Sequence, residues 1–255
     1  MTPALRRSYE LLLALVAKEF KVRYKSTTLG FFWSLANPIF FALVFYVAFR
    51  HILKVSMENY FAFLLAGLFP WQWFANTVNI SPAVFLNNAA LIKKVAFPRL
   101  LLPAAMIGNH LVHFVLALLV AIPVVIAFGS RPTLWWIPGI PALLVVQFGV
   151  ILGLSLMLSS LNVFFRDLEH LTMIFTNLLL YLSPVIYRED LVPEAYRPFF
   201  RLNPLYSIIP AWRHLILEGR LDGAGLLFGA AGAAFLLAVG YLVYRNLEWR
   251  FAESI

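Results

Sequence analysis

Cysteine and charge are the two things that this sequence conspicuously lacks. The 255 residues include no cysteine, so disulfides and thiolate metal sites are excluded. Charged residues make up only 13% of the chain, whereas 62% of residues are hydrophobic and the mean hydropathy is +0.84. Soluble domains do not have this composition, and long apolar runs in such a background predict membrane spans.

Acidic side chains are missing from every apolar run long enough to span a membrane. Proton-coupled carriers and intramembrane metal enzymes usually need such a group. The sequence also lacks a GxxxxGK[ST] phosphate loop, so the chain is not expected to hydrolyse ATP by that route. We find no arrangement of nucleophile, base and orienting group, and we therefore predict no catalytic residue, metal site or cofactor in this chain.

Six apolar segments are each predicted to cross the membrane as a helix. Their approximate bounds are 29–49, 60–81, 102–128, 135–161, 171–186 and 223–244. A helix rises about 1.5 Å per residue, so about 20 residues cross the ~30 Å hydrocarbon core. The predicted fold is an all-α membrane protein, a single domain over residues 1–255.

An amphipathic helix over residues 4–27 is predicted to precede the spans. Its apolar side chains recur every three or four residues, at Leu5, Tyr9, Leu12, Val16, Phe20 and Tyr24. The charged run KEFKVRYK follows without a small-residue cleavage site, so we do not expect this segment to act as a signal peptide. We expect a helix lying in the membrane interface, because the sequence offers no soluble domain on which it could pack.

The functional prediction depends most on the stretch from Asn87 to Pro103, NNAALIKKVAFPRLLLP. It carries three cations and no acid, and Leu91, Ile92 and Val95 fall at helical spacing. A helix over residues 87–98 is predicted to stop at Pro98, because proline lacks the N–H and clashes with the preceding turn. Two interpretations follow: a basic loop that fixes orientation, or a lever on which a soluble partner pushes.

The net charge of +8 comes from basic residues that flank the apolar runs, so topology and anionic lipid headgroups explain it without nucleic acid. With the N-terminus inside, the inner segments hold twelve Lys and Arg residues and the two short outer loops hold three. A long outer segment adds five, offset by five acids. Both termini and residues 87–103 are therefore predicted to be cytoplasmic.

Aromatic and amide side chains inside two spans are candidates for a substrate path. Trp33, Asn37, Phe41 and Phe45 step in fours along the first span, and the second span contains Gln72, Asn76 and Asn79. Amides in a membrane should face protein or a water-filled path. The aromatic rings have two interpretations, as lipid-facing side chains or as a lining for weakly polar faces such as sugar rings.

A proline-rich segment from Tyr187 to Asp222 precedes the last span. Its prolines, aromatics and arginines predict short helices over residues 190–218, at the outer interface or dipping into it. The last span begins with a GxxxG pattern at Gly225 and Gly229, which permits close helix approach but is a weak signal.

Several motifs together resemble the ABC-2 type permeases of polysaccharide exporters. They are KVRYKSTTLGFFWSLANPI (21–39), LIKKVAFPRLLLP (91–103), NVFFRDLEHL (162–171), SPVIY (183–187) and LNPLY (202–206). The nearest resemblance is to the transmembrane subunit of O-antigen exporters, with teichoic acid and capsule exporters as relatives, and it covers essentially the whole chain.

The resemblance implies a six-span half-transporter of the bacterial inner membrane that forms a homodimer and binds two copies of an ATPase subunit. ATP and Mg would be bound by that partner, and the substrate would be a glycan on undecaprenyl pyrophosphate. The predicted contacts with the ATPase are Leu91, Lys93, Lys94, Phe97, Arg99, Arg166 and Asp167. The predicted substrate path contains Trp33, Asn37, Phe41, Phe45, Gln72 and Asn76. The segment before the last span would form re-entrant helices.

Two other functions remain open from the sequence. A drug, small-lipid or haem exporter of the same superfamily would share the fold and the ATPase. A membrane enzyme acting on polyprenyl-linked sugars would need acids at the membrane surface, and its compact candidates are Asp167 with Glu169, or Glu189 with Asp190.

Overall fold

A computed structural model describes residues 3–24, 32–48, 59–130 and 132–254, and every regular element in these ranges is helical. The long helices are α1 (Pro3–Tyr24), α2 (Phe32–Tyr46), α3 (Tyr60–Ile80), α6 (Leu101–Ala127), α7 (Trp136–Asn162), α8 (Leu168–Leu182) and α11 (Gly223–Leu247). The short ones are η2 (Ser81–Ala83), α4 (Val84–Asn87), α5 (Ala89–Lys94), η3 (Glu189–Leu191), α9 (Arg197–Phe200), α10 (Leu205–Glu218), η4 (Glu248–Arg250) and α12 (Phe251–Ser254). The predicted all-α class is confirmed for this part of the chain.

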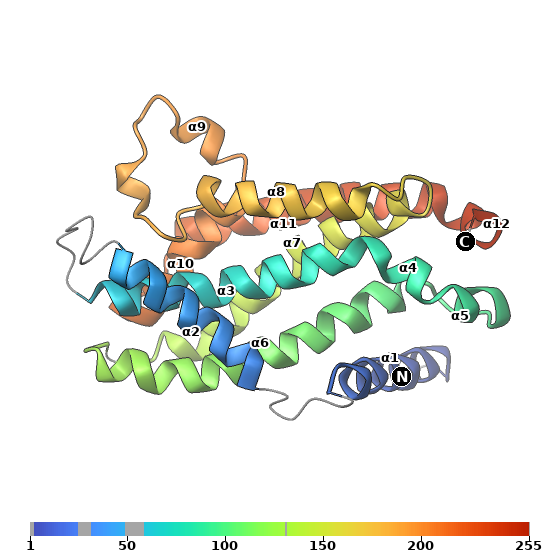
Figure 1. The fold of residues 1–255 in the computed structure, drawn as a ribbon, viewed down its shortest axis with the longest axis horizontal. Coiled ribbons are helices and arrows are strands. Elements are labelled where there is room, and N and C mark those ends of the chain that lie inside the picture. The colour runs from blue at the N-terminus through green and yellow to red at the C-terminus, as the bar shows by residue number, and fades with distance from the viewer. Residues whose placement is uncertain (1–2, 25–31, 49–58, 131, 255) are drawn as a thin grey trace.

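The long helices run mainly along one axis, and the short elements gather at its two ends. Figure 1 shows α5, α12 and both terminal regions at one end, which we call the terminal end. The helices α9 and α10 lie at the opposite end. The segments predicted to be cytoplasmic thus lie together, and the predicted outer segment lies away from them.

In the described part of the chain, three helices are long and apolar enough to cross a membrane by length and composition. They are Leu101–Ala127, Trp136–Asn162 and Gly223–Arg250, with hydropathies of 2.5, 2.2 and 2.2 over their best windows. Over the residues described, the other three predicted spans do not meet this criterion. The helix α8 is apolar but shorter, and α3 carries polar amides. The predicted first span begins and ends outside the described residues. The count of six spans stays a prediction.

Two predicted helix ends were wrong. The predicted span 171–186 is the helix Leu168–Leu182, because Ser183 has the extended backbone that a residue before proline prefers. The predicted helix 87–98 consists of α4 and α5 and ends at Lys94, where the β-branched Val95 is extended at φ −130° and ψ 131°. Pro98 therefore lies beyond a short extended connection and does not terminate the helix directly.

The closest helix contact joins α7 and α11. A Cβ added to Gly153 would lie 2.6 Å from the main-chain nitrogen of Leu237, and one on Gly240 would meet the backbone of Gly153. Contacts advance in the same direction along both helices, because Gly149 faces Ala233, so α7 and α11 run parallel. Small residues allow this approach, as in membrane helix pairs generally.

The predicted GxxxG pair lies mainly against α10, although a Cβ on Gly229 would also lie 3.2 Å from Val146 of α7. A Cβ on Gly225 would meet the carboxylate of Asp222, and one on Gly229 would lie 2.8 Å from Ile208 on α10. The pattern therefore accommodates α10 beside the start of α11, whereas the tight helix crossing depends on glycines that the motif did not include.

The helix α1 packs on α6, which is itself apolar enough to cross a membrane and is not part of a soluble domain. Leu15 is buried, Leu11, Leu12 and Val16 are partly buried against the core, and a Cβ on Gly108 of α6 would lie 3.4 Å from Val16. The other face exposes Tyr9 and Leu13 by about half. An exposed apolar face agrees with a membrane interface, which stays a prediction.

A buried amide joins three helices at the centre of the bundle. Gln147 on α7 donates from Nε2 to the carbonyl of Pro70 on α3 at 2.7 Å, and its Oε1 accepts from the indole of Trp212 on α10 at 2.8 Å. Phe114 of α6 packs edge-on against Trp212 with ring centroids 5.6 Å apart. Because both buried polar side chains are paired, this network fixes α10 inside the bundle at little desolvation cost.

Candidate functional site

The basic segment at the terminal end begins with the short amphipathic helix α5. Ile92 is buried, Leu91 is partly buried against the core, and Lys93 and Lys94 are exposed. This confirms the predicted two faces of the helix. Val95 is half exposed and lies outside the helix, so its assignment to the apolar face was wrong.

Contacts from distant parts of the chain hold this segment in place. Lys18 of α1 donates from Nζ to Oδ1 of Asn88 at 3.0 Å, and Asn88 in turn donates to the carbonyl of Val84. Arg99 donates to the main-chain carbonyl of Glu248 and lies 5.9 Å from the ring centroid of Phe251. The N-terminal helix and the C-terminal turn therefore both brace α5 and the connection to α6.

The second predicted contact with the ATPase lies in the loop between α7 and α8. Arg166 and Asp167 are exposed there. Nearby, Asn162 donates from Nδ2 to the carbonyl of Pro82 and to the carboxylate of Glu169, both at 3.1 Å. These bonds place the loop beside η2, which directly precedes α4, so both predicted contact regions belong to the terminal end.

On α2, the described rings of the predicted substrate path lie in different surroundings. Phe41 is 46% exposed, whereas Phe45 is partly buried against the core, with ring centroids 6.2 Å apart. The side chains of Trp33 and Asn37 lie outside the part that the structure describes. Among the described side chains of α2, the exposed apolar ones are Ile39, Phe40, Phe41, Leu43 and Val44, and Val47 is exposed just after the helix.

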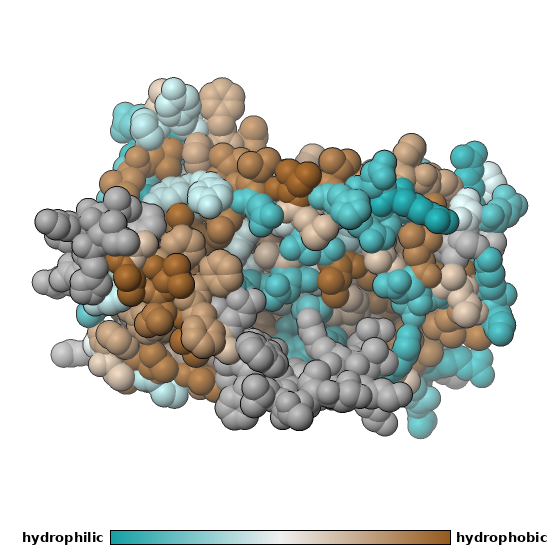
Figure 2. Space-filling view, in the orientation of Figure 1, coloured by the Kyte–Doolittle hydropathy of each residue, from teal (hydrophilic) through white to brown (hydrophobic). Residues whose placement is uncertain are grey.

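A polar strip runs along α3 and meets α8. Gln72 is partly buried and Asn76 is exposed one turn later, while Asn79 accepts a hydrogen bond from Oγ1 of Thr176 at 2.6 Å. Hydrophilic atoms gather in the middle of the face shown in Figure 2, between two hydrophobic areas. An exposed amide in a membrane helix is costly unless water or a polar ligand reaches it, so this strip is suited to a hydrated path.

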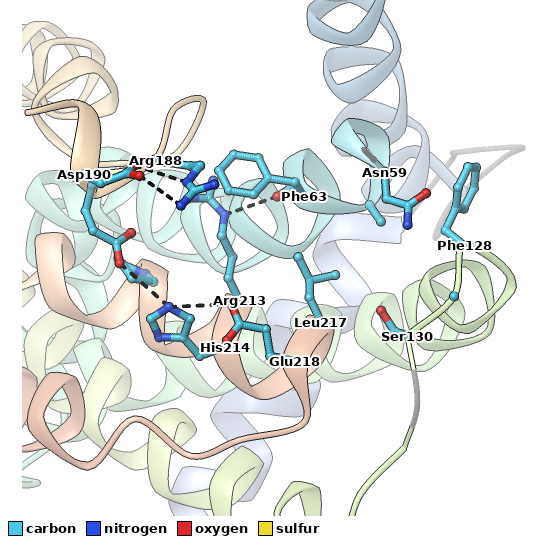
Figure 3. Close-up of a pocket in the computed structure, with 14 residues that line it drawn as sticks. Asn59, Phe63, Phe128, Ser130, Arg188, Asp190, Arg213, His214, Leu217 and Glu218 are labelled. Atoms are coloured by element: carbon cyan, nitrogen blue, oxygen red, sulfur yellow. Dashed lines mark hydrogen bonds and ion pairs between the residues drawn. The ribbon is translucent and has the colours of Figure 1, made fainter. Parts of the chain in front are cut away.

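A buried cation organises the end opposite to the termini. Arg213 on α10 is only 4% exposed and donates to the main-chain carbonyls of Phe63, Pro184, Val185 and Tyr187. Its guanidinium also lies 3.6 Å from the ring centroid of Phe63 on α3 (Figure 3). Carbonyl oxygens and an aromatic face replace the water that the charge has lost. Arg213 therefore joins α3, α10 and the segment that follows α8.

The motifs SPVIY and LNPLY contact each other directly. Asn203 donates from Nδ2 to Oγ of Ser183 at 2.8 Å, and its Oδ1 accepts from the backbone of Leu205, the first residue of α10, at 3.0 Å. Tyr187 donates to the carbonyl of Tyr181, and burial raises the pKa of Tyr187 to about 12, so this hydroxyl stays neutral. The two motifs thus form one folded unit around the break after α8.

His214 follows Arg213 on α10 and faces three carboxylates. Its Nδ1 lies 3.4 Å from the carboxylate of Asp222, and its Nε2 lies 3.7 Å from Glu189 and 3.9 Å from Glu218. His214, Glu189 and Glu218 border a cavity of about 380 Å³, whereas Asp222 lies outside its lining (Figure 3). Within the described ranges, no three His, Asp or Glu side chains are placed to hold a metal ion.

Comparison with known proteins gives this arrangement a family. The sequence pattern of the ABC-2 type transporter matches residues 10–217. The chain belongs to the ABC-2 type transporter family. It is 39% identical over 251 residues to an O-antigen export system permease protein from Klebsiella pneumoniae, covering 97% of this chain and 95% of that protein. It is 32% identical to a protein of the same description from Myxococcus xanthus, covering 96% and 95%. The polysialic acid transport protein KpsM of Escherichia coli is 22% identical over 92% of each chain.

Three features of this ABC-2 protein were not predicted from the sequence. The C-terminal turn around Glu248 contacts Arg99, but nothing in its short charged sequence indicated a partner within the chain. Gln147 holds α3 and α10 together, and the signal available for it was a single amide inside a long apolar span. Arg213 could have been found by the same reasoning, as a cation among apolar residues in the proline-rich segment.

Proposed function

We propose that this ABC-2 protein is the transmembrane subunit of an ATP-driven exporter that moves a lipid-linked polysaccharide from the cytoplasm to the periplasm. The observation that carries the proposal is its 39% identity, over 97% of its length, to an O-antigen export permease. The substrate would be an O-antigen-like glycan carried on undecaprenyl pyrophosphate.

The proposed topology has six spans with both termini in the cytoplasm of a bacterium, in the inner membrane. The arrangement in Figure 1 supports it, because the basic segments with α5 and both terminal regions share one end of the bundle. The parallel run of α7 and α11 also supports it, since the fourth and sixth spans must cross in the same direction. The segment from η3 to α10 then lies on the periplasmic side.

The proposed substrate path lies at the interface of a homodimer, lined by α2, α3 and α8. Each of these helices exposes side chains on the surface of a single subunit, including Phe41 on α2, Asn76 on α3 and Phe175 on α8. Sugar rings offer hydroxyl groups and apolar faces, which amides and aromatic rings contact weakly and repeatedly. Weak contacts at many positions allow a polymer to slide, whereas one tight site would trap it.

Two copies of a separate ATPase subunit, which bind ATP and Mg, are proposed to dock at the terminal end. The contact residues would lie on α5 and the connection that follows it, with Lys93, Lys94 and Phe97, and in the loop that holds Arg166 and Asp167. Binding at α5 would move the bundle because α5 is braced by Lys18 of α1 and leads through Arg99 into α6.

Complementation of a mutant strain tests this proposal. Cells that synthesise a lipid-linked glycan but lack their own permease should regain the surface polysaccharide when this chain and its ATPase are expressed together. The purified chain alone should hydrolyse no ATP above background. Robust hydrolysis by the chain alone, or a complex whose ATPase responds to small amphiphiles but never to the glycan, would contradict it.

Export of a capsular polysaccharide is a second candidate, favoured by the 22% identity to the polysialic acid transport protein. Vesicles containing the assembled transporter can be loaded with a lipid-linked O-antigen glycan or with a lipid-linked capsular polysaccharide. The substrate that stimulates ATP hydrolysis distinguishes the two candidates.

A further inference from the structure

A cavity of about 690 Å³ opens at the terminal end between the α5–α6 connection and the C-terminal turn. Four cations border it, Lys93, Lys94, Arg99 and Arg245, whereas Glu248 is its single acid. Its walls thus come from two segments that are about 150 residues apart in sequence and that the bond from Arg99 to the carbonyl of Glu248 holds together.

The positive charge of this cavity is largely uncompensated. Arg99 reaches the main-chain carbonyl of Glu248 instead of its carboxylate. Among the described residues, Lys93, Lys94 and Arg245 form no ion pair closer than 4.0 Å. A concave surface with one sign of charge concentrates the field and attracts groups of the opposite sign.

The cavity also has an apolar component. Ile92 is buried beneath it, Phe97 is partly buried, and Trp249 stands 64% exposed at its edge. A phosphate group alone would use the cations but leave these side chains without a contact. A peptide segment that combines carboxylates with one or two apolar side chains would satisfy both, and the volume accommodates several side chains.

We propose that this cavity receives an acidic segment of the ATPase subunit, so that the C-terminal turn of the permease is part of the coupling surface. The inference rests on the proposed function, because it assumes that an ATPase docks at this end. It adds a second route for force. The contacts of Arg99 with Glu248 and Phe251 join the α5–α6 connection to the C-terminal turn, which follows α11. The helix α11 in turn packs tightly on α7 at Gly153 and Gly240.

Charge reversal in the assembled transporter tests the inference. Arg245→Glu and Lys94→Glu change two sides of the cavity, and Arg250→Glu is the matched control, because Arg250 is exposed on the same turn but does not line the cavity. ATPase binding to permease in lipid nanodiscs is measured against salt concentration. We expect both cavity variants to bind about tenfold more weakly at ~0.1 M salt with a reduced salt dependence, and the control to stay within about twofold.

A photo-crosslinking amino acid at position 249 identifies the occupant. We expect it to capture the ATPase at a segment containing Asp or Glu, and replacement of that acid by Lys should restore binding to Arg245→Glu. The melting temperatures of the variants and the parent permease should be equal, which separates lost binding from misfolding. Arg245→Gln removes the charge without reversing it and should give an intermediate loss of binding.

Several results would overturn the inference. Normal ATPase binding by both cavity variants would do so, as would crosslinks to phospholipid alone, which would assign the cavity to lipid headgroups. Failure of the cavity inference can be told apart from failure of the proposed function. If the proposed function were wrong, the parent permease itself would bind no ATPase.

Discussion

The guanidinium of Arg213 occupies the space that the missing side chain of Gly67 leaves open. A Cβ at Gly67 would lie 3.0 Å from Cζ of Arg213 and 3.0 Å from the carbonyl oxygen of Val185, and closer still to the guanidinium nitrogen. A glycine on α3 and an arginine on α10 therefore form one structural unit, which explains why the segment after α8 folds back onto the bundle.

Substitution of Gly67 by alanine should destabilise the protein, because the added methyl group displaces a guanidinium held by four carbonyls. Overpacking of this kind costs about 1–3 kcal/mol. Gly108→Ala is the control, since its Cβ would lie at an ordinary 3.4 Å from Val16. Thermal unfolding of the purified protein in detergent should show a lower melting temperature for the first variant alone, and equal values would contradict this account of the contact.

Removal of the buried charge should cost more. In Arg213→Met, the carbonyls of Pro184, Val185 and Tyr187 lose their donor inside the protein, and each unsatisfied buried group costs about 1–3 kcal/mol. We expect low accumulation in the membrane and low export. Arg201→Met changes an exposed arginine four residues after Arg197 and should be tolerated. A stable and active Arg213→Met protein would show that the carbonyls find other donors.

The crossing of α7 and α11 should tolerate no side chain at Gly153. A Cβ there meets the backbone of α11, which cannot move aside as a flexible side chain can, so Gly153→Ala should separate the helices and lower the melting temperature by several degrees. Gly223→Ala places its methyl group in open space at the start of α11 and should leave stability unchanged. An unchanged melting temperature of Gly153→Ala would disprove the tight crossing.

Phe97→Ala, or replacement of both Lys93 and Lys94 by glutamine, should uncouple glycan export from ATP hydrolysis by the partner. These side chains lie at the surface or only partly buried, so the protein should still insert and fold, while glycan export falls about tenfold or more if they transmit force from the ATPase. Export is measured as surface polysaccharide and insertion by membrane fractionation. Crosslinking that places the ATPase far from residues 90–100 would exclude this role.

Accessibility of single cysteines should reveal the path. The chain has no native cysteine, so Phe41→Cys and Asn76→Cys can be labelled without background, and both positions are exposed in the single subunit. We expect a membrane-impermeant thiol reagent to reach them in at least one nucleotide state of the assembled transporter, and to miss Ala42→Cys, since Ala42 is fully buried.

Leu43 and Val47 refine this experiment. Both side chains are about half exposed in the single subunit. Protection of Leu43→Cys and Val47→Cys alongside reactive Phe41→Cys would place lipid on one side of α2 and water on the other. Equal protection at positions 41, 43, 47 and 76 in every state, with normal export, would move the path to another helix.

Local patterns predicted helices better than they predicted contacts. Apolar runs and helical spacing located α3, α6, α7 and α11 to within a few residues, because burial of an apolar stripe or a lipid-facing surface acts over a single helix. The helix ends at Leu182 and Lys94 were misplaced, since the signals there were a proline and a β-branched residue whose effects extend over several positions.

By itself, the sequence determined the helical class, the membrane environment, the clustering of basic residues on one side and the family motifs, all of which depend on composition and on neighbours along one helix. Only the tertiary structure decided which distant residues meet. Arg213 gathers carbonyls from α3 and the segment after α8, Asn203 binds Ser183, and Arg99 binds the C-terminal turn. The physical reason is that a buried polar group needs a hydrogen-bond partner, but every residue has a main-chain carbonyl that could accept the bond. The sequence can therefore predict that a hydrogen bond forms, but it cannot predict which residue accepts it.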